Sequence, residues 1–137
     1  MNWTVEDIPD PDKLFFRIHQ TFIHSGEVKP KVFVERGTDS AKGMSTNWDK
    51  YSTAQNLKDG ARVPEDNGIA SFITGEIRNI GLKVNHAPLE DNQSHTNISG
   101  LPGNPKDTKF RLQMMDMFKW EILPSVEVER NDTNFKD

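Results

Sequence analysis

Residues 75–100, GEIRNIGLKVNHAPLEDNQSHTNISG, carry the clearest structural pattern in this chain. Side chains of one parity share a face of an extended strand, and here that face is apolar until it ends in a histidine. The members of this face are Ile80, Leu82, Val84 and His86. We therefore predict a strand over residues 75–86, ended by Pro88, with His86 at the rim of the core. The polar loop beyond it is the place where a rigid scaffold would present side chains to solvent.

The N-terminal third offers a second alternating pattern. In an extended segment 14–19, Leu14, Phe16 and Ile18 share one face, and Phe15, Arg17 and His19 share the other. A helix beginning at Asp12 is the alternative for the same residues. Further strands are expected over residues 31–35, 69–74 and 125–128, and residues 37–47 read as a loop.

Two helices are expected. Ser52 or Thr53 can cap a short helix that runs through Leu57. A longer amphipathic helix over residues 109–123, capped by Asp107 or Thr108, is predicted from apolar side chains spaced three and four apart. Its stripe consists of Phe110, Met114, Met117, Phe118 and Ile122, and Pro124 ends it.

These elements predict an α+β fold with a mainly antiparallel sheet and a C-terminal amphipathic helix. The 137 residues suit one domain, which we place at residues 1–128, followed by a polar and mobile tail at 129–137.

Composition excludes several classes of function. The chain has no cysteine, which removes disulfides, thiol nucleophiles and Cys-ligated zinc. A net charge of -4 without a dense Lys/Arg cluster disfavours duplex nucleic acid, because phosphate neutralisation supplies most of that affinity. A small anionic ligand remains compatible. The N-terminus lacks the pattern of a signal peptide, and no apolar run could span a bilayer, so we expect a cytoplasmic protein away from membranes.

Histidine is the natural acid/base group near neutral pH, and the chain has four of them. We predict His86 and His95 as acid and base, with His19 as a third catalytic or anion-holding group. For any one histidine taken alone, a structural role in the core or on the surface is the alternative.

A ligand needs groups that hold and orient it. Arg17 shares strand parity with His19 and can bind a phosphate or carboxylate through two hydrogen bonds. Asn92 and Asn97 can orient a ligand or a histidine, and Ser45 lies in a stretch of small residues beside Trp48, whose ring can stack on a base. The alternative for Trp48 is packing over the sheet edge.

A metal site built from His19, His86, His95 and a carboxylate such as Asp91 lacks any zinc-binding spacing, so we predict no metal site and can name no cofactor. An Arg-x-His element followed by a Ser-Thr pair, at Arg17, His19, Ser45 and Thr46, resembles the arrangement in ADP-ribosyltransferases. That resemblance covers only these residues and would imply NAD binding. No glutamate motif of that family follows.

We therefore expect a small protein whose His/Arg/Asn-lined site binds or acts on a phosphate-containing small molecule or an RNA end. The alternative is a non-catalytic interaction module or subunit, in which the C-terminal helix meets a protein partner or a second copy. This alternative is suggested by a group of flexible methionine side chains and one aromatic side chain on the expected helix: Met114, Met115, Met117 and Trp120. Strong salt-dependent affinity for DNA or RNA would instead favour a nucleic-acid-binding module.

Overall fold

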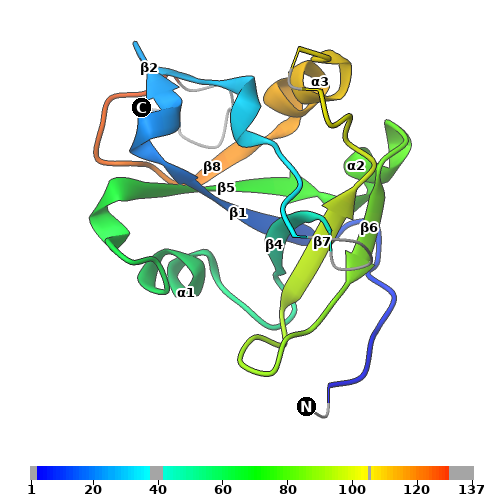
Figure 1. Ribbon diagram of the computed structural model, residues 1–137. Coiled ribbons are helices and arrows are strands. Elements are labelled where there is room, and N and C mark those ends of the chain that lie inside the picture. Colours follow the sequence, from blue (N-terminus) through cyan, green and yellow to red (C-terminus); the bar gives the residue numbers. More distant parts are fainter. Residues whose placement is uncertain (1–2, 38–41, 105, 130–137) are drawn as a thin grey trace.

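The computed structural model describes residues 3–37, 42–104 and 106–129 (Figure 1). Its centre is a six-stranded sheet in the order β6-β7-β4-β1-β5-β8, and all its described pairings are antiparallel. The strands of this sheet are β1 (Lys13–His19), β4 (Met44–Trp48), β5 (Asn67–Ile73), β6 (Lys83–His86), β7 (His95–Ser99) and β8 (Lys119–Ile122). The other elements are α1 (Ala54–Asp59), α2 (Thr74–Asn79), α3 (Lys109–Met117), the hairpin of β2 (Ile23–His24) and β3 (Glu27–Val28), and three 3-10 turns, η1 (Gln20–Phe22), η2 (Pro30–Val32) and η4 (Pro64–Asp66). The α+β fold predicted from the sequence is confirmed.

β1 lies inside the sheet, and its alternation creates the core. Leu14, Phe16 and Ile18 are all buried, as their parity predicts, so the helical alternative for this segment is wrong. The ring centroid of Phe16 lies 5.7 Å from that of Phe33, which in turn lies 5.7 Å from that of Phe72. Clustered aromatic rings of this kind bury large apolar area and supply much of the driving force for folding.

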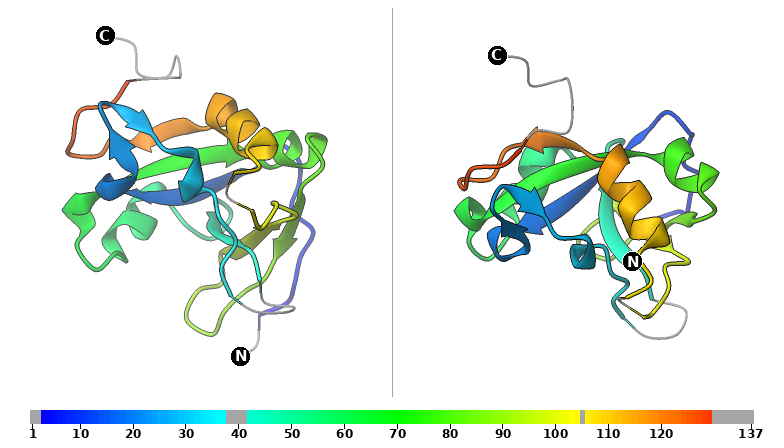
Figure 2. Two further views of the ribbon diagram at one scale, coloured as in Figure 1. Left: turned by 45° about the horizontal axis from the view of Figure 1, so that its top comes forward. Right: turned by 90° about the horizontal axis from the view of Figure 1, so that it is seen from above.

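The other face of the sheet is polar in its middle. Cross-strand pairs place Phe15 opposite Asn47, and Asn47 opposite His95, so these residues share a face with Arg17. α1 lies on this side of the sheet and α3 on the other (Figure 2). We call the two sides the α1 face and the core face. Thr53, one of the two caps that the sequence offered, caps α1, and it does so in a reciprocal capping box with Asn56.

The strand expected over residues 75–86 is only half present. Its first part forms the helix α2, and β6 begins at Lys83. The helix forms because Thr74 and Gly75 donate backbone hydrogen bonds to Asp12 and Asp10, and because Ile77 is then fully buried. Gly81, with φ +101°, turns the chain from α2 into the strand.

The C-terminal helix ends earlier than predicted. Phe118 is already extended, and β8 follows as the edge strand against β5. Burial alternates here, since Phe118 and Trp120 are buried and Lys119 is exposed. Trp120, proposed above as part of an exposed interface, is 1% exposed and belongs to the core. A partner bound elsewhere on α3 stays a prediction.

Three further expectations fail. Residues 31–35 form η2 and an irregular segment, because Val32 and Phe33 are both buried rather than alternating. The loop expected over residues 37–47 contains strand β4, and no strand forms over residues 125–128. The strand expected over residues 69–74 is confirmed as β5.

Residues 130–137 of the predicted tail lie outside the described residues. None of the described helices has the length and apolar character needed to cross a bilayer.

Candidate functional site

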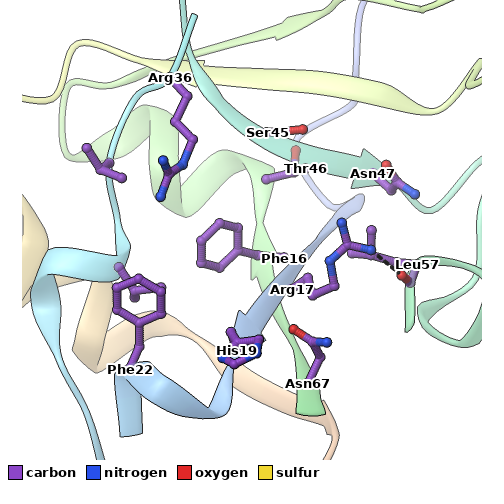
Figure 3. A pocket seen from close by; sticks show the side chains of 12 residues that line it. Phe16, Arg17, His19, Phe22, Arg36, Ser45, Thr46, Asn47, Leu57 and Asn67 are labelled. Atoms are coloured by element: carbon purple, nitrogen blue, oxygen red, sulfur yellow. Dashed lines mark hydrogen bonds between the residues drawn. The ribbon is translucent and has the colours of Figure 1, made fainter. Parts of the chain in front are cut away.

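The site begins where two strands of the sheet separate. β1 pairs with β4 only at Leu14 and Phe15, whereas its pairing with β5 continues to His19. β4 meanwhile stays paired with β7 back to Met44. The sheet therefore opens between the second half of β1 and the first half of β4 (Figure 3).

A hollow of about 280 Å³ occupies this opening, and we call it the cationic hollow. Arg17 reaches it from β1 and Arg36 from the segment after η2, with His19 at the end of β1 (Figure 3). The lining contains no acidic residue, and it is completed by Phe16, Phe22, Val32, Val34, Ser45, Thr46, Asn47, Leu57 and Asn67. Two guanidinium groups in one hollow without a carboxylate create a local positive potential in an otherwise acidic protein.

The two arginines make few contacts that would neutralise them. Nη1 of Arg17 donates to the carbonyl oxygen of Leu57 at 2.9 Å, and no ion pair joins Arg17 or Arg36 to any residue that the structure describes. Desolvation lowers the pKa of Arg17, but a guanidinium stays protonated at neutral pH. Arg17 therefore carries a positive charge that a bound anion could neutralise.

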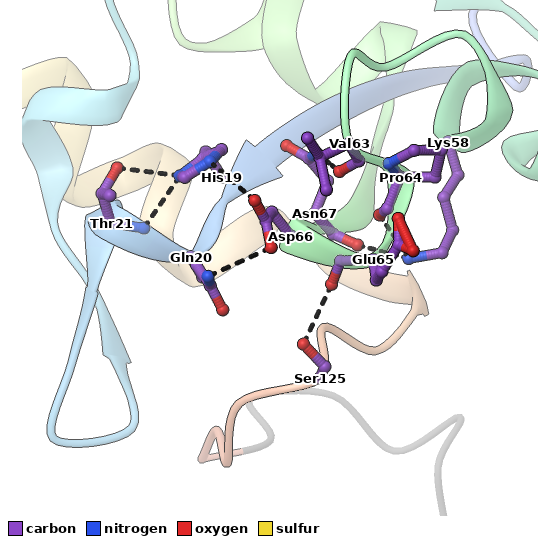
Figure 4. Close-up of polar contacts among 10 residues, drawn as sticks. All are labelled: His19, Gln20, Thr21, Lys58, Val63, Pro64, Glu65, Asp66, Asn67 and Ser125. Carbon is purple, nitrogen blue, oxygen red and sulfur yellow. Dashed lines mark hydrogen bonds and ion pairs between the residues drawn. The ribbon is translucent and has the colours of Figure 1, made fainter.

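One ring nitrogen of His19 is hydrogen-bonded to the backbone, and the other faces the carboxylate of Asp66. Its Nδ1 accepts from the backbone N–H of Thr21 at 3.1 Å, so in the neutral ring Nε2 carries the proton (Figure 4). Nε2 lies 3.8 Å from Oδ2 of Asp66, which lines a neighbouring hollow with Arg17 and Arg62. Asp66 therefore faces Nε2 of His19 without lining the cationic hollow.

A second hollow, of about 530 Å³, lies on the α1 face beside the first, and we call it the neutral hollow. It is lined mainly by amide, hydroxyl and imidazole groups, with Asp91 adding a carboxylate. Its lining residues are Arg17, Ser45, Asn47, Tyr51, Ser52, Asn56, Leu57, Gly60, Leu89, Asp91, Asn92, Ser94 and His95.

A chain of hydrogen bonds fixes the side chains of the neutral hollow. Asn92 accepts from the hydroxyl of Ser94 at 2.5 Å and donates to Oδ1 of Asn47 at 3.0 Å. Asn47 in turn donates to the hydroxyl of Ser52 at 3.2 Å, and Ser52 donates to the carbonyl of Thr53 at 3.0 Å. Such a network holds polar groups in one arrangement before a ligand arrives.

His95 is held so that one ring nitrogen remains available. Its ring contact is between Nδ1 and the carbonyl oxygen of Ala87, at 2.8 Å. A carbonyl only accepts, so Nδ1 must carry a proton, and in the neutral ring Nε2 keeps its lone pair. His95 is half-buried and lines the neutral hollow, so this nitrogen can serve as an acceptor or a base.

The structure separates His86 from these groups. His86 is 4% exposed and lies on the core face, opposite in parity to His95 and Asn47. Its Nδ1 accepts from the backbone N–H of Glu6 at 3.0 Å, and its Nε2 donates to the carbonyl of Gln93 at 2.7 Å. Both ring nitrogens are therefore engaged, and we leave His86 out of the candidate site.

Trp48 and Asn97, which the sequence also predicted to bind a ligand, lie outside both hollows. Trp48 is 1% exposed, packs edge-on against His86 and donates from Nε1 to Asp12 at 2.9 Å, so its ring is a core group rather than a stacking platform. Asn97 lies opposite Ser45 on β7 but lines neither hollow. Arg17, Ser45, Asn92, His19 and His95 are the predicted residues that the hollows bring together.

Sequence reasoning missed Arg36, Asn47 and Asn67 as lining residues. Asn47 could have been found, because it follows Ser45 at the spacing that places both on one face of a strand. No local pattern in the sequence marks Arg36 as a lining residue, because its position depends on the backbone pairing of Arg36 with Gly43, just before β4.

Arg17, His19, Ser45 and Thr46, which carry the resemblance to ADP-ribosyltransferases, all line the cationic hollow. No glutamate joins them in that lining, so the transferase reaction gains no support. Among the described residues, no cluster of three or more His, Cys, Asp or Glu side chains could hold a metal ion. Comparisons with family models, with curated proteins and with solved structures find no match to this chain.

Proposed function

We propose that this protein binds a phosphate-containing ligand in the cationic hollow. The supporting observation is that Arg17 and Arg36 line one hollow, with His19 beside them and no carboxylate in the lining. Guanidinium groups bind phosphate through paired, charge-assisted hydrogen bonds, which are among the strongest polar contacts in proteins.

The remaining lining suits this ligand. Ser45, Asn47 and Asn67 add hydroxyl and amide groups to the lining that can donate to phosphate oxygens, whereas the hydroxyl of Thr46 is already donated to the carbonyl of Thr96 at 2.9 Å. The half-enclosed position lowers the effective dielectric constant, so each contact is stronger than on an open surface. His19 lines the cationic hollow with Arg17, and His95 lines the neutral hollow with Arg17; their action as acid and base on the bound ligand stays a prediction.

Titration calorimetry with inorganic phosphate, in a phosphate-free buffer of low ionic strength, tests the proposal. We expect measurable binding to the wild-type chain and affinity at least about tenfold weaker for Arg36→Ala, because a hydrogen bond to a charged group contributes roughly 1.5–3 kcal/mol. The side chain of Arg36 is exposed and has no described partner, so its removal should leave the melting temperature unchanged.

Lys109→Ala is the matched control. It removes an exposed positive charge from α3, on the core-face side of the sheet, and should leave phosphate affinity as in the wild type. Equal affinities for wild type and Arg36→Ala, or no binding of phosphate at all, would contradict the proposed site.

A further inference from the structure

We infer that the cationic and neutral hollows form one bipartite site for a phosphorylated sugar, an inference that rests on the proposed function. In this arrangement the phosphate lies against Arg17 and Arg36, and the sugar hydroxyls lie in the neutral hollow. The chemical unit is a sugar phosphate, either as a free metabolite or as the phosphorylated end of an RNA chain, and ribose 5-phosphate represents it in the test below.

The two hollows adjoin each other. Their linings share Arg17, Ser45, Asn47 and Leu57, and we place one ligand across both, on the two sides of the side chain of Arg17. Figure 3 shows the guanidinium of Arg17 hydrogen-bonded to the carbonyl of Leu57, at the end of the opening where β1 and β4 meet. Arg17 is therefore placed to bind the phosphate where it joins the rest of the molecule.

The neutral hollow has the chemistry that recognises hydroxyl groups. A sugar hydroxyl both donates and accepts, so a site for it needs fixed donors and fixed acceptors. Asn47 and Asn92 each use one N–H of the amide in the hydrogen-bond chain and keep the other for a ligand. Nε2 of His95 supplies an acceptor, since Nδ1 is held by Ala87.

The lining favours a sugar over a nucleobase. The ring of Tyr51 is stacked on His86 with the planes 24° apart, and Nζ of Lys50 lies 5.1 Å from its centroid. Tyr51 is thus already packed, and of the other residues that line the neutral hollow only His95 carries an aromatic ring, a small imidazole held through Nδ1 by the carbonyl of Ala87. A bare phosphate would leave this second hollow, with its fixed polar groups, unused.

The affinities of three small probes for the wild-type chain test the inference. Ribose 5-phosphate and methyl phosphate carry the same phosphomonoester, and free ribose carries the hydroxyls alone. We expect ribose 5-phosphate to bind at least about tenfold more tightly than methyl phosphate, because two or three added hydrogen bonds each contribute about 1 kcal/mol. A 5′-phosphorylated RNA trinucleotide, measured beside ribose 5-phosphate, distinguishes an RNA end from a free sugar phosphate as the source.

His95→Ala separates this inference from the proposed function. It should weaken ribose 5-phosphate about fivefold and leave methyl phosphate unchanged, whereas Arg36→Ala should weaken both. His24→Ala is the matched control, since His24 is exposed and lines neither hollow.

Equal affinities for ribose 5-phosphate and methyl phosphate would overturn the bipartite site while leaving phosphate binding intact. An unchanged ribose 5-phosphate affinity in a folded His95→Ala variant would do the same. Failure of all phosphorylated probes to bind would remove the proposed function as well. The comparison of probes on the wild-type chain decides the matter even if His95→Ala does not fold.

Discussion

His86 and His95 come from neighbouring strands, yet the parity of β6 and β7 sends them to opposite faces of the sheet. His86 joins the N-terminal segment to the loop before β7, through hydrogen bonds to the backbones of Glu6 and Gln93. His95 instead lines the neutral hollow with Nε2 free of any described contact. The same side chain is thus structural in one place and a candidate ligand contact in the other.

His86→Phe tests this division of roles. The variant keeps an aromatic ring in the core but leaves the N–H of Glu6 and the carbonyl of Gln93 without their partner. We expect a loss of about 2 kcal/mol in the free energy of unfolding, measured by urea denaturation, and unchanged phosphate affinity. His24→Ala, on the exposed surface, should stay within about 0.5 kcal/mol of the wild type. A large loss of phosphate affinity in a folded His86→Phe variant would return His86 to the site.

At the scale of elements, the edge strand β8 is held against β5 by close packing over a glycine. A Cβ at Gly68 would lie 2.7 Å from Cζ3 of Trp120 and 2.9 Å from the backbone nitrogen of Pro124. The nitrogen is part of the main chain and cannot move aside as a flexible side chain can. This contact explains why the chain after α3 can lie flat on β5, with Trp120 buried opposite Ala70.

Gly68→Ala should therefore separate β8 from β5. We expect a loss of about 1–3 kcal/mol in the free energy of unfolding, because overpacking forces backbone shifts. Gly60→Ala is the control: Gly60 has φ -75°, and its added Cβ would meet only ordinary contacts at 3.5 Å or more. That variant should match the wild type or gain a few tenths of a kcal/mol. Similar stabilities for the two alanine variants would show that the packing over Gly68 is loose.

At the scale of the whole molecule, the segment before β1 fastens distant parts of the chain together. Ile8 is buried in the core, and its carbonyl accepts from Arg78 of α2 at 2.7 Å. The carboxylate of Glu6 accepts from Lys50 at 2.6 Å and from the hydroxyl of Tyr51. These hydrogen bonds, first that of Lys50 and then that of Tyr51, lower the pKa of Glu6.

This lowered pKa gives stability a defined dependence on pH. A carboxyl group whose pKa is lower in the folded chain stabilises the fold fully above its unfolded pKa, that is above about pH 5. The contribution is lost as pH falls through the folded pKa. The free energy of unfolding of the wild type and of Glu6→Gln can be measured by denaturation from neutral pH down into acid. The difference between the two proteins should be largest at neutral pH and should shrink as the pH falls.

Glu27→Gln controls for the loss of an exposed carboxylate elsewhere on the surface. We expect its difference from the wild type to be small at every pH. A Glu6→Gln difference that is constant or grows as the pH falls would show that the contacts of Glu6 do not favour its charged form.

The parts of the fold that the sequence predicts correctly are those encoded by near neighbours. Alternation at Leu14, Phe16 and Ile18 gives β1, and a capping residue at Ser52 or Thr53 gives α1, with Thr53 as the observed cap. Arg17, His19 and Ser45 could be identified as candidates because the chemistry of a side chain and its parity in a strand are local properties.

What only the tertiary structure decided depends on partners far away in the chain. Met44–Trp48 has loop-like composition but becomes a strand because β7 and the start of β1 pair with it. The helical spacing of residues 109–123 is interrupted because the edge of β5 binds the chain from Lys119 onward. The site has the same origin. β1 and β4 separate after one short pairing, Arg36 reaches the cationic hollow from the segment after η2, and His95 reaches the neutral hollow from β7. Local pattern sets what each segment can form, and long-range pairing selects among those forms.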